Sequence, residues 1–93
     1  MFDRVLKQLQ ESVRTRKYVM TLHAEEEMTD DGLTIFDVER GILSGKIIER
    51  QKDADTGEWK YLVAGKTLKN GRVVVVTKQS PTGKLVIITV YRE

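Results

Sequence analysis

The sequence predicts an α+β domain with two or three N-terminal helices packed on a four-stranded antiparallel sheet, and two observations predict it. Apolar residues recur at every third or fourth position before Gly45 and at every second position after it. Turn-forming segments then divide the second half into four short runs of strand-forming residues. At 93 residues, the chain is expected to form a single α+β domain over residues 1–93.

The first half carries the signals of three helices. Apolar residues at helical spacing predict the first helix from Phe2 to Lys17. Thr21 is a suitable N-cap for a second helix over Leu22–Asp30, because its side chain can accept a backbone N–H. A capping box of Thr34 and Asp37 predicts the start of the third helix.

The second half carries the signals of three consecutive hairpins. Asn70-Gly71 is a strong two-residue turn signal, and turn residues also cluster at 53–57 and 80–83. An antiparallel meander is therefore expected. Its predicted strands are Lys46–Gln51, Trp59–Thr67, Arg72–Gln79 and Leu85–Tyr91, and residues 18–20 are expected to be an extended link.

Hairpin loops of even length would fix which side chains share a face of the sheet. One face is then aliphatic and packs on the helices: Leu62, Ala64, Val73, Val75, Val86, Ile88 and Val90. The other face mixes aromatic, hydroxyl and cationic groups: Trp59, Tyr61, Val63, Thr67, Arg72, Val74, Val76, Lys78, Ile87, Thr89 and Tyr91. In this register, Arg72 lies opposite Tyr91, and Val74 opposite Thr89.

The mixed face can be interpreted in two ways. Aromatic rings can stack on bases while cations hold phosphates, which makes Trp59, Tyr61, Lys78 and Thr89 candidate substrate-binding residues. The alternative is that the aromatic and β-branched residues, which are ordinary strand formers, form a dimer interface or are covered by the first helix.

Composition and charge restrict the kinds of function. The chain has no cysteine, which excludes disulfides and thiolate metal sites. Seven acids and no Lys or Arg lie between His23 and Glu39, whereas the chain from Lys46 onward is basic. No signal peptide is apparent, and the apolar runs are too short to span a bilayer, so a cytoplasmic protein without membrane contact is expected.

His23 is the single histidine, and its unperturbed pKa suits proton transfer near neutral pH. Glu26 and Glu27 follow at helical spacing and would favour the charged imidazole. The alternative is an ordinary surface histidine in an acidic helix. One histidine beside glutamates gives no closed ligand set, so neither a metal nor another cofactor is expected.

Several segments together resemble the domain of unknown function 4258 family over about residues 18–93. The segments are, in chain order, Thr21–Ala24 with Met28, Asp37–Val38, Gly45–Glu49, Gly65–Thr67 and Val86–Tyr91. Such domains resemble the RelE/ParE-like toxin fold. The resemblance implies a metal-independent ribonuclease of a toxin–antitoxin pair, or a relative that has lost this activity. The implied partners are RNA, an antitoxin protein or a second copy of the chain.

The resemblance also implies roles for particular residues. His23 would be the general acid or base, and Arg72 would neutralise the phosphorane charge with help from Lys78. Tyr91 would orient the phosphate or donate a proton, with Thr89 as a hydrogen-bonding neighbour. The family often has an arginine where this chain has Glu27, whose carboxylate would repel a phosphate. The alternative function is a non-catalytic module whose exposed sheet face binds a protein partner or another copy.

Overall fold

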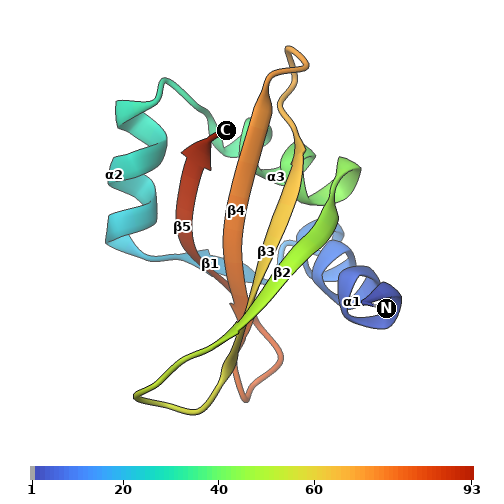
Figure 1. Ribbon diagram of the computed structural model, residues 1–93. Helices are drawn as coiled ribbons and strands as arrows, with labels where there is room; N and C mark the ends of the chain where they lie inside the picture. The colour runs from blue at the N-terminus through green and yellow to red at the C-terminus, as the bar shows by residue number, and fades with distance from the viewer. Residues whose placement is uncertain (1) are drawn as a thin grey trace.

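The computed structural model describes residues 2–93, which form three helices and a five-stranded mixed sheet (Figure 1). The elements follow one another as α1 (Asp3–Arg14), β1 (Tyr18–Met20), α2 (Leu22–Asp30), α3 (Ile35–Ser44), β2 (Lys46–Lys52), β3 (Trp59–Lys66), β4 (Arg72–Gln79) and β5 (Leu85–Arg92). The α+β class is confirmed, and the four long strands start where the sequence predicts them.

The helices begin at the predicted caps. The Thr21 hydroxyl accepts the backbone N–H of Ala24 at 3.0 Å and starts α2. The capping box of Thr34 and Asp37 is present in both directions at the start of α3. Helix α1 ends three residues earlier than predicted, because Arg16 adopts a positive φ of 58° that is incompatible with a helix.

The sheet has the strand order β1-β5-β4-β3-β2, so the prediction of a four-stranded antiparallel sheet was wrong. The segment expected to be a link is strand β1, which pairs parallel with β5, Tyr18 opposite Leu85. Three residues are too few to show an alternating pattern, so the sequence held no signal for this strand. The first residues of β5 are therefore paired on both sides, by β1 and β4, whereas its later residues are paired with β4 alone.

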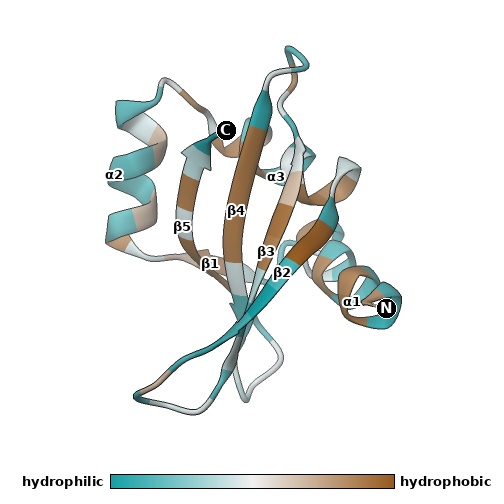
Figure 2. Ribbon diagram, in the orientation of Figure 1, coloured by the Kyte–Doolittle hydropathy of each residue, from teal (hydrophilic) through white to brown (hydrophobic). Residues whose placement is uncertain are grey.

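One face of the sheet carries the core. Helix α3 packs on β3 and β4, α1 packs on α3, and α2 lies beside β5, as Figure 1 shows. The approach of α3 is close, since a Cβ added to Gly65 would stand 1.9 Å from the carbonyl oxygen of Gly41. The buried apolar residues of this core are Leu9, Val13, Ala24, Leu33, Val38, Ile42, Val63, Val73, Val75, Leu85, Ile87 and Val90. Figure 2 shows the same division, with apolar central strands and a largely hydrophilic α2.

The predicted grouping of side chains by face was wrong for β3 and for half of β5. Lys66 pairs with Arg72, which leaves five residues in the hairpin loop instead of an even number. Val63 therefore points to the core, and Leu62 and Ala64 point away from it. These five loop residues include the predicted turn at Asn70, which has a positive φ.

The error in β5 comes from a β-bulge. Val76 pairs with Thr89 and Thr77 pairs with Ile87, so Ile88 is an extra residue without a partner in β4. Ile87 is consequently fully buried, whereas Val86 and Ile88, which were predicted to lie in the core, are half-buried. Val90 lies on the other side of the bulge and occupies the core as predicted.

Within residues 2–93, none of the helices has the length and apolar character needed to cross a membrane.

Candidate nucleic-acid interface

None of the helices formed by residues 2–93 packs on the face of the sheet opposite the core, called here the outer face (Figure 1). The strand register defines its members, because directly opposed residues share a face. They are Lys46, Glu49, Gln51, Lys60, Leu62, Ala64, Lys66, Arg72, Val74, Val76, Lys78, Val86, Thr89 and Tyr91. An aliphatic centre is thus surrounded by charged and polar groups.

The charge of the outer face is strongly positive. Five of its members are cations, Lys46, Lys60, Lys66, Arg72 and Lys78, and Glu49 is the one carboxylate among them. The Lys78 ammonium is partly neutralised, because it lies 3.2 Å from the Glu58 carboxylate. Among residues 2–93, the Arg72 guanidinium has no ion-pair partner. Seven acids and no Lys or Arg lie between His23 and Glu39, on α2 and the start of α3, whereas α1 carries charges of both signs. We call the α2–α3 part of the molecule the acidic helical side.

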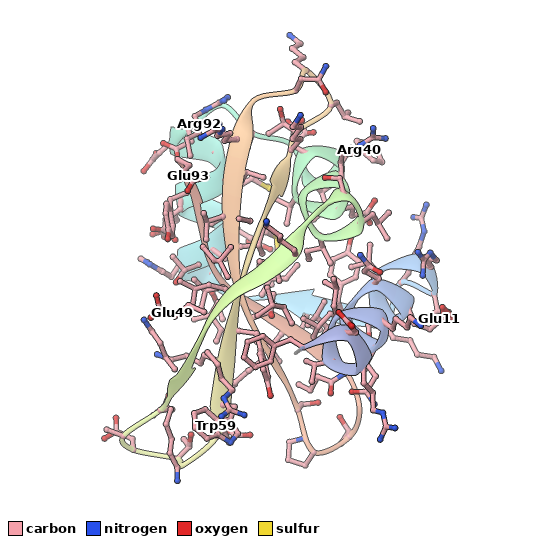
Figure 3. The ribbon with its side chains drawn as sticks, turned by 45° about the vertical axis from the view of Figure 1, so that its right-hand side comes forward. Glu11, Arg40, Glu49, Trp59, Arg92 and Glu93 are labelled. Carbon is pink, nitrogen blue, oxygen red and sulfur yellow. The ribbon has the colours of Figure 1, made fainter. Side chains whose placement is uncertain are left out.

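Three of these cations border an open hollow of about 270 Å³ at one end of the outer face. Lys46, Lys66 and Arg72 line it together with Gly45 and Gly65, and Glu93 adds one carboxylate to the lining. A cluster of cations around exposed backbone suits an anionic group such as a phosphate, since charge-assisted hydrogen bonds are the strong ones. Figure 3 shows Glu93 beside Arg92 at this end of the sheet.

Arg72 and Tyr91 do share the outer face, as predicted, but they are not opposite each other. Tyr91 is opposite Val74, and Thr89 is opposite Val76, so the pairing is displaced by two residues from the predicted register. The hollow that Arg72 lines does not include Tyr91 or His23. The predicted catalytic residues therefore do not form one cleft in this structure.

His23 stands on α2, next to the β5 edge of the sheet. Its side chain is 65% exposed, and its Nε2 lies 3.2 Å from the Glu27 carboxylate. The same oxygen of Glu27 accepts the backbone N–H of Val90 at 3.2 Å. The imidazole is thus accessible to a ligand and is tied, through Glu27, to the strand that carries Tyr91.

The role of Glu27 was not predictable from its position in the sequence. β1 covers only the first residues of β5, which leaves the backbone of the later residues unpaired on that edge. Glu27 and Asp31 supply the missing acceptors, because Asp31 Oδ2 accepts the backbone N–H of Arg92 at 3.4 Å. Helix α2 therefore closes this edge with two carboxylates spaced one turn apart.

Trp59 and Tyr61 do not lie on the outer face, which corrects their assignment as neighbours of Lys78 and Thr89. Tyr61 is opposite both Arg50 and Thr77 in the register, on the same side of the sheet as the helices. The ring of Phe2, just before α1, packs edge-on against Tyr61 with ring centroids 6.1 Å apart. Tyr61 is thus partly covered by the residue that precedes α1, whereas Trp59 remains 40% exposed.

Asp37 and Tyr18, both outside the outer face, have perturbed pKa values with clear causes. Backbone N–H groups of Thr34 and Leu68 donate to Asp37 and hold the pKa of its carboxyl below the usual range. Burial, together with its hydrogen bond to Glu39, raises the pKa of the Tyr18 hydroxyl to about 12. Both groups support the fold, since each ties a helix to another segment.

Within the part of the chain that the structure describes, no three His, Asp or Glu side chains gather in a way that could hold a metal ion. Residues 20–92 match the family model described as Domain of unknown function (DUF4258). No curated protein and no solved structure matches the chain.

Proposed function

We propose that this chain, which belongs to the DUF4258 family, binds RNA across the outer face of its sheet in the manner of a RelE-like toxin domain. The observation that carries the proposal is the segregation of charge, with five cations on the one sheet face that no helix covers. A polyanion would be attracted to this face and repelled by the acidic helical side.

The chemistry of the outer face favours a single-stranded nucleic acid. A sheet surface can hold a flexible backbone along its cations while unpaired bases rest on apolar or aromatic side chains. Val74, Val76 and Tyr91 offer that apolar support, and the hollow beside Arg72 offers a phosphate site. The resemblance to RelE/ParE-like toxins supports RNA as the nucleic acid.

The proposal is tested by titrating the protein with a short single-stranded RNA at several salt concentrations. Arg72→Ala and Lys66→Ala should each weaken binding and lower the slope of log K against log salt by roughly 0.7, as expected for one lost phosphate contact. Lys78→Ala should have a smaller effect, because Glu58 already neutralises part of that charge.

A matched control is Lys7→Ala, which removes the same charge from an exposed position on α1. It should leave both affinity and salt slope unchanged. Absence of binding at low salt would contradict the proposal, and a mass that rises with protein concentration would then favour self-association through the outer face.

RNA cleavage is a second candidate function, and the exposed His23 favours it. The imidazole has a carboxylate partner 3.2 Å away, which suits a general acid or base. An RNA strand that crosses β5 from the outer face passes α2, where His23 could act on a phosphate oriented by Tyr91, while Arg72 holds another phosphate of the strand in the hollow. The general acid–base mechanism needs side chains alone, and an antitoxin would act by covering this surface.

Cleavage is tested with a mixed RNA pool in the presence of a chelator. His23→Ala should lower the cleavage rate about 10²–10⁴-fold, and its melting curve should match the wild type because the side chain is exposed. Tyr91→Phe should cost less if the hydroxyl only orients the phosphate. Equal cleavage by wild type and His23→Ala would place the activity elsewhere, and absence of cleavage by both would leave a non-catalytic binding module.

A further inference from the structure

The part of the molecule that neither the core nor the outer face uses is the far end of the β2–β3 hairpin. Here the strands extend past α1, as Figure 3 shows by the position of Trp59 at the end opposite Arg92 and Glu93. On the helix side of this extension, Arg50 is opposite Tyr61 and Lys52 is opposite Trp59. We call Phe2, Arg50, Lys52, Trp59 and Tyr61 the hairpin cluster.

Arg50 is held between two rings of this cluster. Its Cζ lies 3.9 Å from the centroid of the Trp59 ring and 5.7 Å from that of Phe2. The Lys52 ammonium lies 5.7 Å from the same Trp59 ring. Such cation–π contacts orient the guanidinium without using its hydrogen-bond donors. Within residues 2–93, Arg50 and Lys52 have neither an ion-pair nor a side-chain hydrogen-bond partner.

The carboxylates nearest in sequence are engaged elsewhere. Glu49, next to Arg50, lies on the outer face and accepts a hydrogen bond from the Gln51 side-chain amide. Asp53 accepts the backbone N–H groups of Asp55 and Thr56, which build the hairpin turn. Glu58 binds Lys78. The two cations beside Trp59 are therefore oriented and unneutralised, and the tryptophan itself is 40% exposed although the fold does not require an exposed ring.

We propose that the hairpin cluster binds one unpaired nucleotide of a single-stranded RNA. The base stacks on the exposed part of Trp59, and Arg50 and Lys52 hold the adjacent phosphate. A planar ring next to free guanidinium donors matches these two parts of a nucleotide, since stacking and charge-assisted hydrogen bonds recognise them separately. The inference rests on the proposed function, because it adds a second contact to the same RNA.

The two contacts lie at opposite ends of strand β2. Lys46 borders the hollow of the outer face, and Lys52 belongs to the hairpin cluster. Six residues of strand separate them by about 20 Å. A strand bound at both sites would follow the β2 edge, and the joint attachment would raise affinity above that of either site alone.

The experiment uses the fluorescence of Trp59, the only tryptophan in the chain. Single-stranded RNA is added while tryptophan emission and RNA anisotropy are recorded together. Emission should change in parallel with anisotropy, because the base stacks directly on the indole. Inorganic polyphosphate serves as the matched anion without bases, and it should leave the emission nearly unchanged.

Two variants test the phosphate contact. Arg50→Ala should weaken RNA binding several-fold, and Lys52→Ala should weaken it less. Lys52 is exposed and makes no hydrogen bond within residues 2–93, so this variant keeps the test valid if Arg50→Ala fails to fold. Lys84→Ala, in the exposed turn before β5, removes the same charge elsewhere and should bind like the wild type.

The outcomes separate this inference from the proposed function. RNA binding that depends on Arg72 but leaves Trp59 emission and Arg50→Ala affinity unchanged would overturn the hairpin cluster alone. An equal emission change with polyphosphate would overturn base stacking. Failure of RNA to bind at low salt would overturn both proposals together.

Discussion

The two faces of the sheet bury the first three valines of β4 equally well by different means. Val73 and Val75 of β4 face the core and are 0% exposed under the helices, and Val74 faces the other way and is still only 1% exposed. No helix covers Val74, whose neighbours on the outer face are Ala64, Arg72 and Tyr91.

The comparison shows what long polar side chains can do on an open sheet. The stems of Arg and Lys and the ring of Tyr cover apolar surface while their polar ends stay in water. A cover of this kind can move aside for a ligand, whereas a packed helix cannot.

Adjacent valines on β4 should respond very differently to a charge. Val75→Asp places an unpaired carboxylate in the core and should abolish folding, at a cost of several kcal/mol. Val76→Asp lies on the half-buried outer face and should leave a folded protein with a lower melting temperature. Circular dichroism melting curves measure both, and similar melting of the two variants would disprove the assignment of faces.

The β-bulge gives a second pair of neighbours. Ile87→Ala removes a fully buried side chain and should cost about 2–5 kcal/mol of unfolding free energy. Ile88→Ala should cost clearly less, because Ile88 is half-buried and has no partner in β4. Urea titrations of both variants provide the test. A larger loss for Ile88→Ala would mean that β5 follows the unbulged register.

Prediction from the sequence succeeded for helix caps and strand starts and failed for the facing of some strand residues. The caps at Thr21 and Thr34 and the start of each long strand follow from local chemistry, and all were correct. The four consecutive valines of β4 carry no alternation, so their facing depends on the pairing of β3 and β5. That pairing depends on the odd length of the loop between β3 and β4 and on the bulge at Ile88 in β5. No local sequence pattern indicates either feature.

The candidate site shows the same limit. The sequence correctly placed four residues on one face: Arg72, Lys78, Thr89 and Tyr91. The first two lie on β4, whose facing was predicted correctly, and the last two lie on the part of β5 that follows the bulge. Lys46 and Lys66 were missed, since their place beside Arg72 requires the order of three strands. Arg50 was missed as well, and its spacing from Trp59 becomes meaningful only in the hairpin register.

A substitution of Glu27, whose carboxylate binds the edge of β5, should change both the stability of the protein and its affinity for RNA. Replacing Glu27 with arginine, the residue that the family resemblance led us to expect there, would add positive charge near His23, and the sequence alone predicts tighter RNA binding. The structure adds a cost, because Glu27→Arg leaves the Val90 N–H without its acceptor, at about 1–3 kcal/mol. We therefore expect lower stability together with higher RNA affinity. Glu27→Gln is the control, because its amide oxygen can still accept the Val90 N–H while the negative charge is lost. Equal melting temperatures of Glu27→Arg and wild type would show that this hydrogen bond is dispensable for stability.

Two tyrosines give the smallest and most specific contrast between the core side and the outer face. Tyr18 packs against the core and donates its hydroxyl hydrogen to Glu39, whereas Tyr91 points from the outer face and its hydroxyl makes no hydrogen bond within residues 2–93. Tyr18→Phe should cost about 1 kcal/mol, and Tyr91→Phe should change stability by less than about 0.5 kcal/mol.

The pH dependence of stability identifies the cause of the Tyr18 effect. Burial and the hydrogen bond to Glu39 raise the pKa of Tyr18 from 10.0 to about 12, so the folded state holds this proton more tightly than the unfolded state does. The stabilisation is therefore complete below pH 10 and is lost as the pH rises from there through about 12. Denaturant titrations between pH 9 and pH 12 should show the difference between wild type and Tyr18→Phe shrinking toward high pH, whereas the difference for Tyr91→Phe stays near zero. A wild-type advantage over Tyr18→Phe that persists unchanged to pH 12 would show that folding does not raise the pKa of the Tyr18 hydroxyl.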